Sequence, residues 1–331
     1  MTALPTPTPT PDLDQAPPFR PSPRRWLRLA IGLPLFAAVC YFVGRSLASD
    51  FKKIDWANLN LNYLSIVAAL ACLILARAMN GLNCTVLLAS LGQRAPLRRV
   101  IPVIWLASLG RYIPGKMAVV AGAALMLTRL GIRMPAALAA LFLSTALMII
   151  MSLLTCLPLL LTPALRTAMP FGWLLGLAIL LIGLVCLHPP IFTRLANVAL
   201  LRLKRQPLLP RLATMPLLQA VAVSLFRCLF LAAALCFTAQ SIAPVPPSAF
   251  ALFLGSASLA SVAGFLAVFA PAGLGVHEGV YLLTLTPLLG PAAALLAILF
   301  RLLHIISDIL TALAALPLIA KSPTPSPKQV T

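Results

Sequence analysis

The chain has 331 residues, of which 61% are hydrophobic and only 9% are charged, with a formal net charge of +19. Apolar runs of about 20 residues recur along it, which is typical of polytopic membrane proteins and not of soluble enzymes. No hydrophilic connection exceeds about 30 residues, which leaves no room for a soluble catalytic domain. The basic residues lie between apolar runs, where they report topology, so no nucleic-acid partner is predicted.

All seven cysteines lie in apolar segments or at their ends, and none forms a CxxC pair or a metal-spaced Cys/His cluster. We therefore interpret them as small core hydrophobes. No Ser-His-Asp order and no phosphate-binding GxxxxGK[ST] motif is present. The sequence predicts no catalytic residue, no cofactor and no metal site.

Six apolar segments are predicted to cross the membrane: 29–47, 63–91, 135–161, 171–189, 215–239 and 291–317. The first follows four arginines and is interpreted as an uncleaved signal anchor, which places the N-terminus in the cytoplasm. Residues 1–25, rich in proline, and residues 321–331 are predicted to be disordered cytoplasmic tails. Between them, residues 26–320 form one membrane domain.

A first break interrupts the apolar run of residues 100–130 at Pro114 and Gly115. Each limb has about 12–15 residues, fewer than the ~20 that a spanning helix needs. A single span would place Arg129 outside, whereas a hairpin returns it to the cytoplasm. Because proline removes a backbone donor and Pro-Gly favours a turn, we predict a re-entrant helical hairpin here.

A second hairpin is predicted over residues 248–288, broken between Pro271 and Gly275 and entered from outside. Its first limb is long enough to cross the membrane, so two full spans are the alternative. Sixteen Lys and Arg fall at predicted cytoplasmic positions, four outside and five at membrane depth, which fits either topology. The two hairpins have opposite orientations, as in an inverted repeat. The predicted fold is an all-α polytopic membrane helix bundle of about six spanning helices plus two re-entrant hairpins, or six to ten apolar helices by count.

Polar groups at membrane depth are costly to bury and are the candidate functional residues. Guanidinium groups suit phosphate, and a helix start after each break offers free amides to an anion. The predicted lipid headgroup-binding residues are Arg77, Asn80, Arg111, Lys116, Arg227 and Arg301. The predicted gate residues at the two breaks are Pro114, Gly115, Pro271, Gly273 and Gly275. The groups predicted to couple transport to an energy source are His277, Glu278, His304 and Asp308.

These assignments have structural alternatives. Arg301 or Arg227 would pair with Asp308 without binding any ligand. Glu278 would be solvated in a loop between ordinary spans, and the histidines would serve packing. By count alone, Glu278 and Asp308 would suit two-carboxylate glycosidase chemistry, although nothing in the sequence places them together.

Three stretches resemble a known family: Arg77 in its apolar segment, Gly110-Arg111-Tyr112-Ile113-Pro114-Gly115-Lys116, and Pro271-Ala272-Gly273-Leu274-Gly275-Val276-His277-Glu278. They look like the flippase-like membrane domain of lysylphosphatidylglycerol synthases, over roughly residues 26–320. The resemblance implies a stand-alone, multi-pass protein of the bacterial inner membrane. Aminoacyl transfer belongs to the family's soluble domain, so no enzymatic activity is implied. The resemblance also implies a polar or acidic group in segment 135–161, where the chain has Ser144 and Thr145.

The predicted function is lipid translocation, with an anionic or polar headgroup bound between the two hairpins and both termini in the cytoplasm. The predicted ligand is an anionic phospholipid or a lipid-linked intermediate, and further partners would be a second copy or an envelope-biosynthesis protein. Two alternatives belong to other classes. One is a membrane-embedded transferase acting on lipid-linked sugars or hopanoids, and the other is an accessory scaffold without a site of its own.

Overall fold

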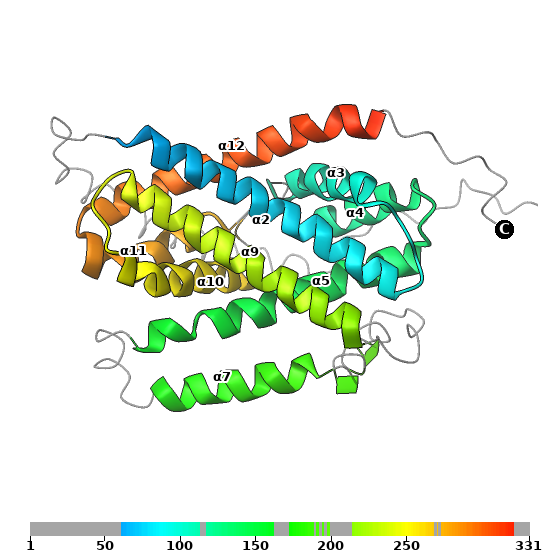
Figure 1. Cartoon of the computed structure of the whole chain (residues 1–331), viewed down its shortest axis with the longest axis horizontal. Coiled ribbons are helices and arrows are strands. Elements are labelled where there is room, and N and C mark those ends of the chain that lie inside the picture. Colours follow the sequence, from blue (N-terminus) through cyan, green and yellow to red (C-terminus); the bar gives the residue numbers. More distant parts are fainter. Residues whose placement is uncertain are drawn as a thin grey trace, which may run out of the picture.

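The computed structural model describes residues 61–112, 117–161, 172–188, 190–191, 194, 197–198, 214–267, 270 and 273–320. Within these ranges every regular element is a helix, which confirms the prediction of an all-α bundle (Figure 1). The predicted segment 29–47 and both predicted tails lie outside the described residues.

In the part of the chain that the structure describes, five helical stretches are long and apolar enough to cross a membrane, because each keeps its backbone hydrogen bonds within an apolar segment of at least about 18–20 residues. They correspond to α2 (Tyr63–Ser90), α5 (Met134–Thr155), α9 (Thr214–Gln240), α10 (Phe250–Leu266) and α12 (Ala292–Ala320). Four of them match predicted spans. The fifth, α10, is the long first limb of the predicted second hairpin.

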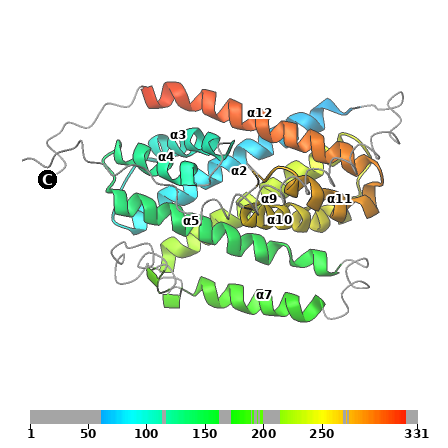
Figure 2. The same cartoon turned by 180° about the vertical axis from the view of Figure 1, so that it is seen from behind.

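Helices α2 and α9 pack against each other in antiparallel orientation at the centre of the bundle (Figures 1 and 2). At one end, the backbone N–H of Asn62 donates to the carbonyl of Ser241 over 3.1 Å. At the other end, Leu87 of α2 shares a hydrophobic cluster with Leu217 of α9. The two helices therefore run the same course in opposite directions.

The first predicted hairpin corresponds to α3 (Leu97–Ser108), the 3-10 helix η2 (Leu109–Tyr112) and α4 (Met117–Thr128), with α3 packed against α4. Its 12-residue limbs are each about 18 Å long, well short of the ~30 Å hydrocarbon core. The backbone N–H of Arg133 donates to Oε1 of Gln93 over 3.3 Å, which places the loops before and after the hairpin at the same end. The single-span alternative for residues 100–130 is therefore wrong.

The second predicted hairpin corresponds to α10, entered through η4 (Pro247–Ala249), and α11 (Val276–Leu289), which pack against each other. Re-entry of this pair stays a prediction, because α10 is itself of spanning length. Figure 1 shows α3 and α4 in one half of the length of the bundle and α10 and α11 in the other half. The two hairpins thus approach the middle from opposite ends. A further helix, α7 (Gly172–Leu187), lies at the periphery, where it packs on α5 and on η3 (Leu157–Leu161).

The helix contacts of the first half of the fold repeat in the second half. The helices α2, α3, α4 and α5 correspond in that order to α9, α10, α11 and α12. Helix α3 packs on α2, α4 and α12, and its counterpart α10 packs on α9, α11 and α5. Likewise α4 packs on α5 as α11 packs on α12, and α2 packs on α12 as α9 packs on α5. Together with the antiparallel central pair, this is the arrangement that an inverted repeat predicts.

Candidate functional site

One face of α12 carries the polar residues on which both hairpins converge. Arg301, His304 and Asp308 are spaced by three and four residues, so they lie above one another on the same side of the helix. Asp308 is the seventeenth of the 29 residues of α12, roughly 25 Å from its start. Because α2, α3 and α11 all pack against α12, this face is buried at mid-helix.

Asp308 is the centre of the first polar cluster, and its side chain is only 1% exposed. Arg77 of α2 forms an ion pair with Oδ1 through Nη1. The hydroxyl of Tyr112 donates to Oδ2 over 2.7 Å, and that of Ser108 donates to Oδ1 over 3.3 Å. The predicted alternative pairing of Asp308 with Arg301 or Arg227 is therefore wrong, because Asp308 receives its charge partner from α2.

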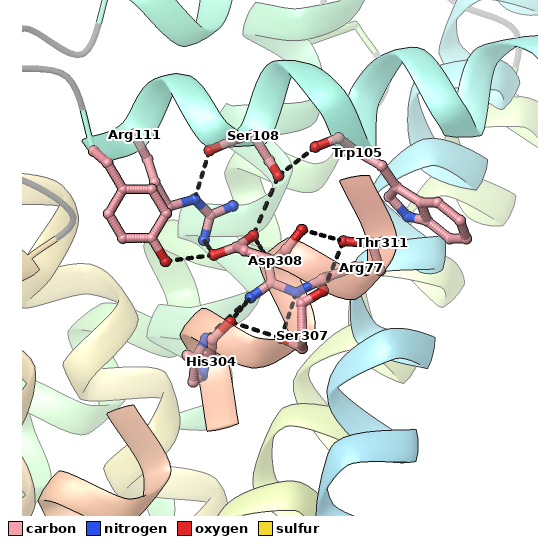
Figure 3. Close-up of polar contacts among 9 residues, drawn as sticks. Arg77, Trp105, Ser108, Arg111, His304, Ser307, Asp308 and Thr311 are labelled. Atoms are coloured by element: carbon pink, nitrogen blue, oxygen red, sulfur yellow. Dashed lines mark hydrogen bonds and ion pairs between the residues drawn. The ribbon is translucent and has the colours of Figure 1, made fainter. Parts of the chain in front are cut away.

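Arg77 is buried, and each of its three guanidinium nitrogens has a partner on α12 (Figure 3). Besides the ion pair, Nε donates to Oγ of Ser307 over 2.8 Å, and Nη2 donates to the carbonyl of His304 over 3.0 Å. Such a fully engaged guanidinium holds α2 to α12. For Arg77 to bind a phosphate, this network would first have to open.

Arg111 joins the cluster from the tip of the first hairpin. Its Nη1 lies 4.0 Å from Oδ2 of Asp308, and Nε donates to the carbonyl of Ser108 over 3.1 Å. The side chain of Arg111 is 36% exposed, against 8% for Arg77. Arg111 therefore has donors directed away from the buried carboxylate, and it is the more accessible cation of this cluster.

Glu278 forms the second polar cluster, at the start of α11. Its Oε2 accepts a hydrogen bond of 2.8 Å from the backbone N–H of Gly275, where φ is +81°. Its Oε1 lies 3.8 Å from Nη1 of Arg301. Glu278 is buried, so the alternative of a solvated loop carboxylate is wrong. The helix start that was predicted to attract a headgroup anion already holds its own carboxylate.

His277 links the two hairpin limbs and begins a series of stacked rings. Its imidazole lies against Gly264 of α10 and Gly273, and a Cβ at either glycine would overlap it. The rings of His277, Tyr281, Phe300 and His304 then follow one another in edge-to-face contacts, with centroids 4.7–6.4 Å apart. This series connects the Glu278–Arg301 pair to the Arg77–Asp308 pair through packed aromatic contacts.

The remaining predicted residues lie elsewhere or outside the described part of the chain. Asn80 is half-buried on α2, one turn from Arg77. Arg227 is half-buried in the middle of α9, and its Nη1 donates to Sγ of Cys228 at 3.6 Å. The four residues whose placement falls outside the described ranges are Pro114, Gly115, Lys116 and Pro271.

Sequence reasoning did not select four residues that the structure brings into these clusters: Ser108, Tyr112, Ser307 and Gly264. Tyr112 and Ser108 come shortly before the predicted break at Pro114 in the sequence, and this closeness was the available signal. The implied polar group of segment 135–161 does have a counterpart. Ser144 of α5 accepts a hydrogen bond of 3.4 Å from Asn83 of α2.

No group of three or more His, Cys, Asp or Glu is placed to hold a metal ion among the described residues. The chemical property that these clusters provide is a group of charged side chains. Three guanidinium groups, of Arg77, Arg111 and Arg301, face two carboxylates, of Glu278 and Asp308, at mid-helix. The excess of positive charge among these described residues makes the region suited to binding an anionic group.

In a comparison with known families, residues 25–312 match the lysylphosphatidylglycerol synthase transmembrane region. This range contains every helix from α2 to α11 and most of α12, including both polar clusters. A comparison with curated proteins found no match.

Proposed function

The chain belongs to the family of the lysylphosphatidylglycerol synthase transmembrane region, and from this premise we propose that it translocates an anionic or polar lipid. The headgroup would bind between the two hairpin tips, against the face of α12 that carries Arg301 and Asp308. The proposed setting is the bacterial cytoplasmic membrane, with both termini in the cytoplasm. No catalytic step is part of the proposal.

One observation carries the proposal: both hairpins end at the same charged face in the middle of an apolar helix. Charged side chains at this depth are expensive unless they pair or line a pathway. Among the residues that the structure describes, three arginines face two carboxylates here, so this region carries more positive than negative charge. A phosphate group would restore neutrality, and a guanidinium binds phosphate through two parallel hydrogen bonds.

Arg111 is the residue best placed to meet an arriving headgroup. It is partly exposed and lies near the end of the described first limb of the hairpin, and its distance to Asp308 is long for an ion pair. A phosphate would compete with Asp308 for Arg111 while Arg77 keeps the carboxylate neutralised. Arg301, paired at 3.8 Å with Glu278, would play the corresponding part toward the second hairpin.

The two hairpins would act as gates because each reaches the charged region from a different end of the bundle. A short re-entrant hairpin leaves the other half of the bilayer thickness open to a cavity or to lipid. Gly273 and Gly275 have positive φ values of +67° and +81°, which permits a tight reversal at the second tip. Alternate withdrawal of the two tips would expose the headgroup to one leaflet at a time.

The test is a reconstitution experiment with a matched control. Purified protein is placed in liposomes that contain fluorescent phosphatidylglycerol, and dithionite then quenches the outer leaflet. We expect quenching beyond the outer-leaflet fraction, and we expect Arg111→Ala or Arg301→Ala to abolish it. The control is Arg98→Ala, which removes the same charge from an exposed position at the base of the first hairpin. Equal activity of Arg111→Ala and Arg98→Ala would contradict the proposed site.

The alternative functions give different results in the same preparation. A transferase would convert the lipid into a headgroup-modified product, which thin-layer chromatography or mass spectrometry of the liposomes would detect. A scaffold would neither move nor modify lipid, and it would keep its cellular function when Arg111 and Glu278 are replaced.

A further inference from the structure

Two arginines occupy matching positions on the antiparallel central helices. Arg77 is the fifteenth of 28 residues of α2, and Arg227 is the fourteenth of 27 residues of α9. The contact of Asn62 with Ser241 at one end sets the register, which places both arginines at the same level. In the inverted repeat, α9 is the counterpart of α2 and α5 is the counterpart of α12. The sites around Arg77 and Arg227 therefore correspond to each other.

The two sites differ in their counter-ion. Arg77 meets the carboxylate of Asp308 on α12. The described part of the counterpart helix α5 carries no acidic residue, and its Ser152 has Oγ 3.9 Å from Sγ of Cys228, the neighbour of Arg227. Both carboxylates in the described part of the chain are already paired with arginines of the hairpin clusters. Arg227 therefore has no carboxylate there, and its recorded contact is the thiol of Cys228 at 3.6 Å.

A guanidinium in this position needs an anion. It stays charged at any physiological pH. From the fourteenth residue of α9, each end of the helix is roughly 20 Å away, so the side chain does not reach bulk water by extending along the helix. A thiol is a weak acceptor and engages at most one of the five N–H donors. The half-buried side chain leaves access from one side.

We propose that Arg227 anchors a second anion-binding site, separate from the hairpin tips, whose ligand is a phosphate group. In the membrane this would be the phosphodiester of an anionic lipid. The guanidinium would bind two phosphate oxygens. The thiol of Cys228 contacts Arg227 at 3.6 Å, and Oγ of Ser152 lies 3.9 Å from that thiol. This site holds its ligand whether or not the protein translocates lipid.

The test supplies the missing counter-ion from inside the protein. Cys228→Asp places a carboxylate where the thiol now contacts Arg227, and Cys228→Asn has the same shape without the charge. Arg227→Gln removes the cation, and Arg227→Lys retains it. Native mass spectrometry of the purified full chain, titrated with phosphatidylglycerol in detergent, gives the affinity of each retained lipid. Inorganic phosphate in excess is added in a parallel titration.

We expect Arg227→Gln and Cys228→Asp each to weaken one phosphatidylglycerol site about tenfold or more, while Cys228→Asn and Arg227→Lys retain it. If excess inorganic phosphate displaces phosphatidylglycerol from this site, the ligand is phosphate itself. If phosphatidylglycerol stays bound in excess phosphate, the ligand is the lipid phosphodiester. The proposal is overturned if Cys228→Asp and Cys228→Asn bind phosphatidylglycerol with equal affinity. It is also overturned if Arg227→Gln lowers thermal stability without changing the affinity for phosphatidylglycerol. Arg111→Ala acts on the hairpin site only, so its effect on phosphatidylglycerol affinity should add to that of Arg227→Gln. Its result tests the proposed function and leaves the Arg227 site untouched.

Discussion

Neutralising Asp308 is expected to destabilise the protein more than removing the whole ion pair. Asp308 is 1% exposed and accepts hydrogen bonds from Arg77, Ser108 and Tyr112. Asp308→Asn keeps the shape of the side chain but leaves the buried Arg77 without its charge partner. Loss of one member of a buried pair costs about 3–5 kcal/mol of the free energy of unfolding.

The double variant Arg77→Met/Asp308→Asn tests the cause of that loss. It removes the stranded charge, so we expect it to be more stable than Asp308→Asn alone. Reversible unfolding in mixed detergent micelles measures all three variants. Thr311→Ala serves as the control, because its hydroxyl bonds only to carbonyls of its own helix and its loss should cost about 1 kcal/mol. The reasoning is refuted if the second substitution lowers stability further.

Three more predictions concern the hairpin tips. Gly264→Ala would overlap the His277 imidazole, so we expect the packing of α10 on α11 to loosen, with faster proteolysis of the second hairpin as the measurement. Tyr112→Phe removes a 2.7 Å hydrogen bond to Asp308 and should lower the free energy of unfolding by about 1.5 kcal/mol in the same micelle assay. Glu278→Gln retains an acceptor for the N–H of Gly275, so Glu278→Ala should be the less stable of the two, and equal thermal midpoints would contradict the cap.

Four of the predicted spans and the reversal between α3 and α4 follow from local composition. Segment 171–189 corresponds to the 16-residue helix α7, and segment 29–47 lies outside the described residues. Segment 63–91 was predicted and α2 is Tyr63–Ser90, since the apolar run and the basic residues after it fix both ends. Likewise, the limbs around Pro114 were too short to span, which required a reversal. Length, charge and proline are sufficient for such elements, and no knowledge of tertiary contacts is needed.

The partners of the charged residues were not predictable in this way. Arg77 and Asp308 are separated by 231 positions, and the sequence offered three mid-membrane arginines for one carboxylate. Which of them reaches Asp308 depends on the packing of α2 and α3 on α12, which periodicity does not specify. The role of Gly264 was not predictable either. A glycine within an apolar helix is seen to be required only once the neighbouring side chain is placed, and here that side chain is the imidazole of His277.

The distance along the chain between Arg77 and Asp308 also has a consequence for biogenesis. Synthesis proceeds at about 5–20 residues per second, so the 231 residues between them take on the order of 10–50 s to emerge. During that interval α2 has left the ribosome with an arginine at its centre and its carboxylate has not been made. An isolated helix of this kind inserts at a penalty of about 2.5–3.5 kcal/mol. Synthesis of α12 therefore completes the insertion of α2, and a ribosome stalled before α12 would leave α2 dependent on a chaperone, the translocon or an anionic lipid.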